Sequence, residues 1–292
     1  MLQLQTPVSI SRAPFSIDPM ERMLFVGSCF ADNIGRRFVE DKFRAVVNPY
    51  GVMYNPASIL HTVERHLAET TEFPRTVVFT LGTNHVYILN STGEIVDNCR
   101  KRPQRLFTER ELSVDECCDY LSRAVEQLRR ANPAVRVIVT VSPIRYAKYG
   151  FHGSQLSKAT LLLAADRLVR QYAAPTEREG NAAEAETVSP YVVYFPAYEI
   201  VNDELRDYRF YREDMLHPSD QAVGYISQRF AETFFSERTH EFLNKWKPIK
   251  AALAHRPFNP DSEEYRQFLA NAKAAEQQLI SSYLPSTSSI SQ

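Results

Sequence analysis

Five short apolar runs, each closed by a turn residue, constrain the fold of this chain more than any other feature. They cover residues 23–26, 45–47, 76–81, 135–141 and 191–195. The run at 76–81 shows no apolar–polar alternation, which is typical of a strand covered on both faces. Stretches with helical spacing separate the runs, and this order favours a parallel sheet with right-handed crossovers. We therefore predict an α/β fold with five parallel strands in the order 2-1-3-4-5 and helices on both sides.

The rest of the chain predicts fewer regular elements. Residues 86–112 look irregular apart from a hairpin around 91–93, and a last helix is expected over 263–280. No internal repeat and no clean linker marks a second core. We predict one main domain over residues 1–242 and a C-terminal helical appendage with a Ser-rich tail over residues 243–292.

Charge and composition exclude several classes of protein. The chain has 292 residues with 34 Lys and Arg against 35 Asp and Glu, so its net charge is −1. A balanced charge provides no field that attracts nucleic acid or an anionic membrane, and neither is expected as a partner. The N-terminal residues lack a basic segment followed by an apolar core, so no secretory signal is expected. We predict a cytoplasmic protein with reduced thiols.

Metal and nucleotide motifs receive no support from the sequence. The histidines at 61, 66 and 85 lack metal-binding spacing, and two of the four cysteines are adjacent, at 117 and 118. Neither a Walker loop nor a GxGxxG motif is present. We therefore expect no cofactor and no metal site. The oligomeric state is not indicated by any pattern.

The residues just after each predicted strand are the candidates for a functional site. In an open parallel sheet, ligands bind beyond the C-terminal ends of the strands. Possible nucleophiles, two Asn, an Arg and three glycines follow the runs. These segments are Gly27-Ser28-Cys29, Asn48-Pro49-Tyr50-Gly51, Gly82-Thr83-Asn84-His85, Ser142-Pro143-Ile144-Arg145 and Pro196-Ala197-Tyr198-Glu199.

The first of these segments offers two interpretations. Gly27 permits a tight turn, and amides at a helix N-terminus favour negative charge, which suits a thiolate or an oxyanion. Cys29 or Ser28 is then a nucleophile. The simpler alternative is a helix start, with Ser28 as the N-cap and Cys29 as a small buried residue. From the tripeptide alone, the simpler alternative is favoured.

Asp214 and His217 form a second candidate group. An acid and an imidazole three residues apart can meet, so one segment supplies both a base and the carboxylate that orients it. Pro218 biases His217 away from helix, which places its ring on a loop. An exposed acidic turn with an incidental His is the alternative.

Two further residues have both a functional and a purely structural interpretation. The Asn84 amide can donate to an oxyanion, although Asn is also common in turns. Arg100, within a basic run at 100–102, can bind an anionic group of a substrate, although such runs are more often solvated loops.

Taken together, these segments resemble the SGNH (GDSL-like) hydrolase superfamily. A nucleophile turn after the first strand, a glycine after the second, Gly-x-Asn after the third and Asp-x-x-His near the end form one ordered set. The chain is more closely similar to the GSCFA family of bacterial proteins, over residues 20–235. The segments that carry this resemblance are Gly27-Ser28-Cys29-Phe30-Ala31, Asn48-Pro49-Tyr50-Gly51-Val52, Tyr54-Asn55-Pro56, Leu81-Gly82-Thr83, Val86-Tyr87, Asn98-Cys99, Thr140-Val141-Ser142-Pro143, Ser157-Lys158 and Tyr208-Arg209-Phe210-Tyr211.

The resemblance implies a three-layer α/β/α hydrolase-like domain and roles for individual residues. It implies that Asp214 and His217 are the acid–base pair and that Gly51 and Asn84 belong to the oxyanion hole. Without a gap, Cys29 occupies the position of the superfamily nucleophile, and we place it slightly ahead of Ser28. The residues expected to contact the substrate are Tyr87, Arg100 and Arg145.

The expected function is acyl hydrolysis through a covalent nucleophile–His–Asp mechanism. The substrate is expected to carry an O-acyl group on a small molecule or a saccharide, with an acetylated saccharide suggested by analogy to the superfamily alone. Two alternatives remain open at this point. One is an acyl-CoA-dependent O-acyltransferase, and the other is a catalytically silent binding module on the same scaffold.

Overall fold

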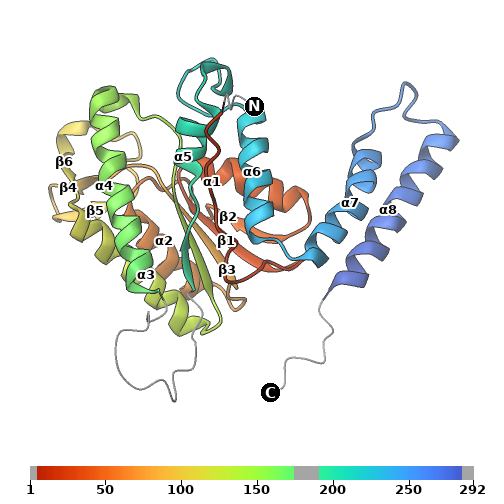
Figure 1. The fold of residues 1–292 in the computed structure, drawn as a ribbon, viewed down its shortest axis with the longest axis horizontal. Helices are drawn as coiled ribbons and strands as arrows, with labels where there is room; N and C mark the ends of the chain where they lie inside the picture. The colour runs from red at the N-terminus through yellow and green to blue at the C-terminus, as the bar shows by residue number, and fades with distance from the viewer. Residues whose placement is uncertain (1–4, 174–190, 285–292) are drawn as a thin grey trace.

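The computed structural model describes residues 5–173 and 191–284, and its core is a five-stranded parallel sheet (Figure 1). The strands lie in the order β2-β1-β3-β7-β8, and every neighbouring pair is parallel. Their bounds are β1 (Arg22–Gly27), β2 (Arg44–Val47), β3 (Thr76–Leu81), β7 (Arg136–Val141) and β8 (Val192–Tyr194). This confirms the five predicted strands and their order.

Helices cover both faces of the sheet, which confirms the expected three-layer arrangement. Alternate side chains of β1 enter opposite layers. Leu24 and Val26 belong to one apolar cluster, whereas Met23 and Phe25 belong to the other. The first cluster contains α2 (Pro56–Glu69), α3 (Val114–Ala131) and α4 (Gly150–Gln171), and the second contains α1 (Cys29–Glu40) and α6 (Asp220–Phe234).

Five short helical turns lie in the connections of the described chain. They are η1 (Gln104–Leu106), η2 (Ala147–Tyr149), α5 (Ala197–Glu199), the π-helix η3 (Ile200–Leu205) and η4 (Tyr208–Phe210). Turn η2 follows β7, and α5, η3 and η4 lie between β8 and α6.

A small antiparallel sheet replaces the irregular segment that the sequence predicted. It consists of β4 (His85–Leu89), β5 (Glu94–Val96) and β6 (Phe107–Glu111) in the order β5-β4-β6. The hairpin between β4 and β5 was expected. The strand β6 was missed because only its first residue is apolar, so the sequence shows no two-residue alternation.

A helical hairpin forms the C-terminal part of the described chain and stands beside the sheet core (Figure 1). It consists of α7 (Glu237–Ala254) and α8 (Glu263–Tyr283), and α8 confirms the last predicted helix. Helix α7 was not predicted, and it runs across residue 242. The division of the chain there stays a prediction. The Ser-rich tail from residue 285 lies outside the described residues.

No helix within residues 5–173 and 191–284 combines the length and the apolar character that a bilayer crossing needs. The four cysteines are all unpaired thiols.

Candidate active site

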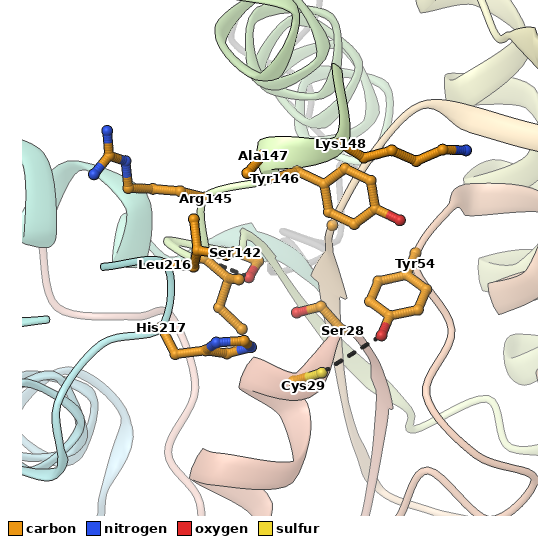
Figure 2. A pocket seen from close by; sticks show the side chains of 12 residues that line it. Ser28, Cys29, Tyr54, Ser142, Arg145, Tyr146, Ala147, Lys148, Leu216 and His217 are labelled. Atoms are coloured by element: carbon orange, nitrogen blue, oxygen red, sulfur yellow. Dashed lines mark hydrogen bonds between the residues drawn. The ribbon is translucent and has the colours of Figure 1, made fainter. Parts of the chain in front are cut away.

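A pocket of about 240 Å³ lies where β1, β3 and β7 end. It gathers residues that are far apart in the sequence, because the C-terminal ends of parallel strands meet at one edge of the sheet. Figure 2 shows their side chains around one hollow. The lining residues are Ser28, Cys29, Tyr54, Gly82, Ser142, Ile144, Arg145, Tyr146, Ala147, Lys148, Leu216 and His217.

The turn from β1 into α1 depends on Gly27. Its φ is +146°, and a Cβ there would lie 2.2 Å from the carbonyl oxygen of Thr80. The close approach lets the Ser28 amide donate to that same oxygen at 3.0 Å. The Ser28 hydroxyl is buried and accepts from the Phe30 amide at 3.2 Å. Ser28 is therefore the N-cap of α1, as the simpler interpretation of this segment expected.

Cys29 is the first residue of α1, and it does not fill the core. Its side chain is half-buried and lines the pocket. Its Sγ atom lies 3.6 Å from the hydroxyl of Tyr54 (Figure 2).

His217 and Asp214 meet as the sequence predicted. The Nδ1 atom of His217 lies 2.6 Å from Oδ2 of Asp214. The other carboxylate oxygen accepts from the amides of Leu216 and His217, both at 2.9 Å. These two amides and the imidazole ring lower the pKa of Asp214 to about 2. The imidazole, held by a charged carboxylate, lines the pocket together with Cys29.

The two residues expected to form an oxyanion hole are placed elsewhere. The Asn84 amide is buried and its Nδ2 atom donates to the carbonyl oxygen of Leu112 at 2.8 Å. Gly51 lies on an exposed turn with φ +96°. Neither is among the described residues that line the pocket. Their part in binding an oxyanion stays a prediction, and the pocket offers other donors.

The three expected substrate contacts differ in their relation to the pocket. Arg145 lines it, but its guanidinium group points away from Cys29 (Figure 2) and donates to the carbonyl oxygen of Met215 at 3.1 Å. Tyr87 bonds through its hydroxyl to Lys148, which lines the pocket. Arg100 lies on an exposed turn with φ +50° and is not among the described lining residues.

Several residues of the site were missed in the sequence. Tyr54 and Tyr146 contribute two aromatic rings, with centroids 6.0 Å apart. Tyr54 immediately precedes Asn55 and Pro56, the N-cap and first residue of α2, and this Asn-Pro helix start was a usable signal. Lys158 was missed as well, although its position on the apolar side of its helix, one turn before Leu161, was a usable signal.

Lys158 supports the floor of the pocket from below. It is buried, and its Nζ atom donates to the carbonyl oxygens of Gly82 at 2.7 Å and Ser142 at 2.8 Å. Both of those residues line the pocket at the ends of β3 and β7. Burial lowers the pKa of Lys158 to about 7. A neutral amine still has two N–H groups, one for each carbonyl.

The fold and the pocket define an α/β/α protein in which a thiol and an imidazole line a pocket at the strand ends, and a carboxylate is bonded to the imidazole. The sequence profile of the GSCFA family matches residues 22–76 and 71–230, and that of the C-terminal domain of GSCFA domain proteins matches residues 246–289. The chain therefore belongs to the GSCFA family. No curated protein gives a significant sequence match to it.

Solved structures with a similar backbone fold include esterases. An acetyl esterase variant with an acetate ion is 16% identical, covering 77% of this chain and 99% of its own, with a TM-score of 0.43. A carbohydrate esterase family 3 protein from Talaromyces cellulolyticus is 14% identical, covering 77% and 99%, with a TM-score of 0.41. A Clostridium thermocellum family 3 carbohydrate esterase is 13% identical, covering 77% and 97%, with a TM-score of 0.41. At these values, the likeness does not indicate what the present chain acts on.

Proposed function

We propose that this protein is an acyl hydrolase of the esterase type, with Cys29 as the nucleophile, His217 as the base and Asp214 as the residue that orients the base. One observation carries this proposal. The thiol of Cys29 and the ring of His217 line the same pocket, and Oδ2 of Asp214 lies 2.6 Å from Nδ1 of that ring. A nucleophile beside a base that a third group orients is the general arrangement of covalent acyl transfer.

The proposed reaction has two stages. His217 accepts the proton of the Cys29 thiol, and the sulfur bonds to the acyl carbon while the carbonyl electrons move onto oxygen. The tetrahedral intermediate collapses, and the leaving alcohol takes the proton from the imidazolium. Water then attacks the thioester, losing its proton to His217, and Cys29 is released with that proton. Asp214 stays charged throughout and stabilises the imidazolium.

The backbone amide of Cys29, at the start of α1, is the first candidate to bind the oxyanion, because the amides of Ser28 and Phe30 already donate to Thr80 and to the Ser28 hydroxyl. The helix dipole favours negative charge there. Each donor aimed at the oxyanion contributes about 3 kcal/mol to lowering the barrier. Asn84 adds a second donor only if its amide leaves the carbonyl of Leu112.

Pocket size and lining restrict the acyl group. The cavity of about 240 Å³ is bounded by Tyr54, Tyr146 and Leu216 around Cys29. A short acyl group, such as acetyl, suits this space. The alcohol part of the substrate then extends over the rim near Arg145 and Lys148. An acetylated saccharide is the candidate that the superfamily resemblance suggests.

A thiol nucleophile also favours the second candidate, an acyl-CoA-dependent O-acyltransferase. Exchange between a thioester donor and Cys29 forms one thioester as it breaks another, so the step is nearly balanced in energy. A hydroxyl acceptor in place of water then completes the transfer. This candidate requires an acyl donor and an acceptor together, whereas the hydrolase needs water alone.

The test is to incubate the protein with p-nitrophenyl acetate and with an acetyl thioester, and to map acetylated residues by mass spectrometry. We expect acetylation of Cys29, which is lost in Cys29→Ala and retained in Ser28→Ala. Acetylation of Ser28 that persists in Cys29→Ala would overturn the choice of nucleophile. Absence of any acetylation or turnover with both reagents would favour the silent binding module instead.

A further inference from the structure

The hydroxyl of Tyr54 is held at the nucleophile by the backbone around it. The Tyr54 carbonyl oxygen accepts from the amides of Gly82 and Thr83, at 2.9 and 2.8 Å. Gly82 is needed for this approach, because a Cβ there would lie 2.9 Å from that oxygen. The side chain of Asn55 caps α2 by accepting from the Ser58 amide at 3.0 Å. This hydrogen bond fixes Asn55, the neighbour of Tyr54 in the chain. The end of β3 and the start of α2 therefore set the position of Tyr54.

The ring is directed into the pocket. Its centroid lies 6.0 Å from that of Tyr146, with the rings at 61°. The hydroxyl reaches to 3.6 Å from the Cys29 Sγ atom (Figure 2). Partial burial, followed by the hydrogen bond to Cys29, raises the pKa of Tyr54 above its ordinary value. The phenol therefore stays protonated near neutral pH and can donate.

The reaction proposed above changes what this hydroxyl can bond to. Once Cys29 is a thiolate, only Tyr54 of the pair has a proton to donate. When the sulfur bonds to an acyl carbon, the carbonyl oxygen lies one bond from that carbon and next to the same hydroxyl. The negative charge moves from sulfur to this oxygen, so a donor close to both atoms stabilises it in both states. The side-chain amide of Asn84 was expected to supply a hydrogen bond to this oxygen. In the structure it donates to the carbonyl oxygen of Leu112 instead.

We propose that Tyr54 is a catalytic residue that donates a hydrogen bond to the oxyanion of the tetrahedral intermediate formed on Cys29. The inference rests on the proposed function, since it needs acyl chemistry at Cys29. It assigns part of the oxyanion site to a phenol from the segment before α2, in addition to the Cys29 amide at the start of α1.

The test compares two reactions of the same thiol in Tyr54→Phe and in the unchanged protein. Acetylation by p-nitrophenyl acetate builds negative charge on a carbonyl oxygen, whereas alkylation by iodoacetamide does not. We expect Tyr54→Phe to slow acetylation of Cys29 by about 100-fold, the usual loss for one oxyanion donor. We expect alkylation to change by less than about threefold, because it builds no charge on a carbonyl oxygen for Tyr54 to stabilise.

Tyr50→Phe is the matched control, since it removes a hydroxyl from the same chain segment. That hydroxyl bonds to Glu69, and Tyr50 is not among the described residues that line the pocket. Both rates should remain unchanged in this variant. Thermal unfolding of Tyr54→Phe should also match the unchanged protein, because the ring and its packing are kept.

The outcomes separate this inference from the proposed function. If the unchanged protein is acetylated at Cys29 but Tyr54→Phe slows acetylation and alkylation equally, or slows neither, Tyr54 has no oxyanion role and the proposed function stands. If Cys29 of the unchanged protein is alkylated but never acetylated, the proposed function fails and this inference fails with it.

Discussion

Asp214 is fixed in its charged form by groups within three residues of it. Two backbone amides and the His217 ring lower its pKa to about 2, below the ordinary 3.8. The carboxylate is therefore ionised at every pH where an imidazole titrates. A loss of activity between pH 7 and 5 would therefore not reflect protonation of Asp214.

Asp214→Asn should reduce turnover by about 100-fold or more. An amide at this position keeps the shape of the side chain but favours the wrong tautomer of His217 and cannot stabilise its charged form. The measurement is the rate of Cys29 acetylation. Glu213→Gln, the exposed neighbour, is the control and should leave the rate unchanged. Equal rates in Asp214→Asn and the unchanged protein would exclude an orienting role for Asp214.

Lys158 makes the stability of the fold depend on pH in a defined direction. Burial lowers its pKa from 10.5 to about 7. Between these values, the unfolded chain binds a proton that the folded chain does not, so stability rises with pH across this window. Below about pH 7 the cost of burying the charge is present in full, and above about 10.5 it vanishes.

Lys158→Met removes the titrating group and both hydrogen bonds to Gly82 and Ser142. The unchanged protein should gain stability over this variant as the pH is raised from 7 to 9. Urea unfolding at both pH values measures the difference in free energy of unfolding. A difference that is constant or shrinks with pH would show that Lys158 stays charged in the folded protein.

At the scale of elements, the strand ends place the site, and Gly27 shows how closely they must approach. Its φ of +146° is strained for any residue with a side chain, and an added Cβ would clash with Thr80 of the neighbouring strand. Gly27→Ala should therefore destabilise the protein by about 3 kcal/mol or more. Gly93→Ala, with φ +73° and open space around it, should cost about 1 kcal/mol. Chemical denaturation compares them, and equal losses would contradict the close approach.

Much of the fold could be predicted because burial leaves a simple pattern in the sequence. The strands β3 and β7 are buried along nearly their whole length, so their residues are apolar on both faces. Strand β6 is mostly exposed and polar, and its pairing with β4 is decided by contacts that the sequence does not display. Helix α7 was missed for a related reason, since few of its residues are buried.

The site residues that directly follow strands could be predicted from the sequence. The contacts that depend on the direction of a side chain could not. Cys29 and Arg145 were found because each follows a strand. Position alone did not show that the Asn84 amide turns to Leu112, a bond that depends on the unpredicted strand β6. Lys158 was missed because it reaches the pocket floor from a helix rather than from a strand end.

At the scale of the whole molecule, the helical hairpin is joined to the sheet core by several specific contacts. Trp246 is the single tryptophan of the chain, and its Nε1 atom donates to the Glu40 carbonyl oxygen at 3.1 Å. Lys250 pairs with Glu40 and Asp41, and the Thr239 hydroxyl donates to the Ile17 carbonyl oxygen at 2.7 Å. Trp246 also packs in an apolar cluster with Met20.

These contacts predict that hairpin and core unfold together. The tryptophan fluorescence reports the environment of Trp246, whereas far-UV circular dichroism reports the whole chain. Both signals should change at the same denaturant concentration, since coincident transitions indicate a single cooperative unit. A fluorescence change well before the loss of circular dichroism would mean that the hairpin detaches on its own.

The wide separation of the pocket residues along the chain has a consequence for how the protein becomes active. Cys29, Tyr54 and His217 come together only after β1, β3, β7 and β8 have paired, and each of these pairings closes a long loop. Parallel pairings of this kind form slowly, because the entropy of loop closure is lost before any contact compensates it. A newly made chain would therefore acquire helices early and the pocket late, and a fragment that ends before residue 217 would lack the proposed base.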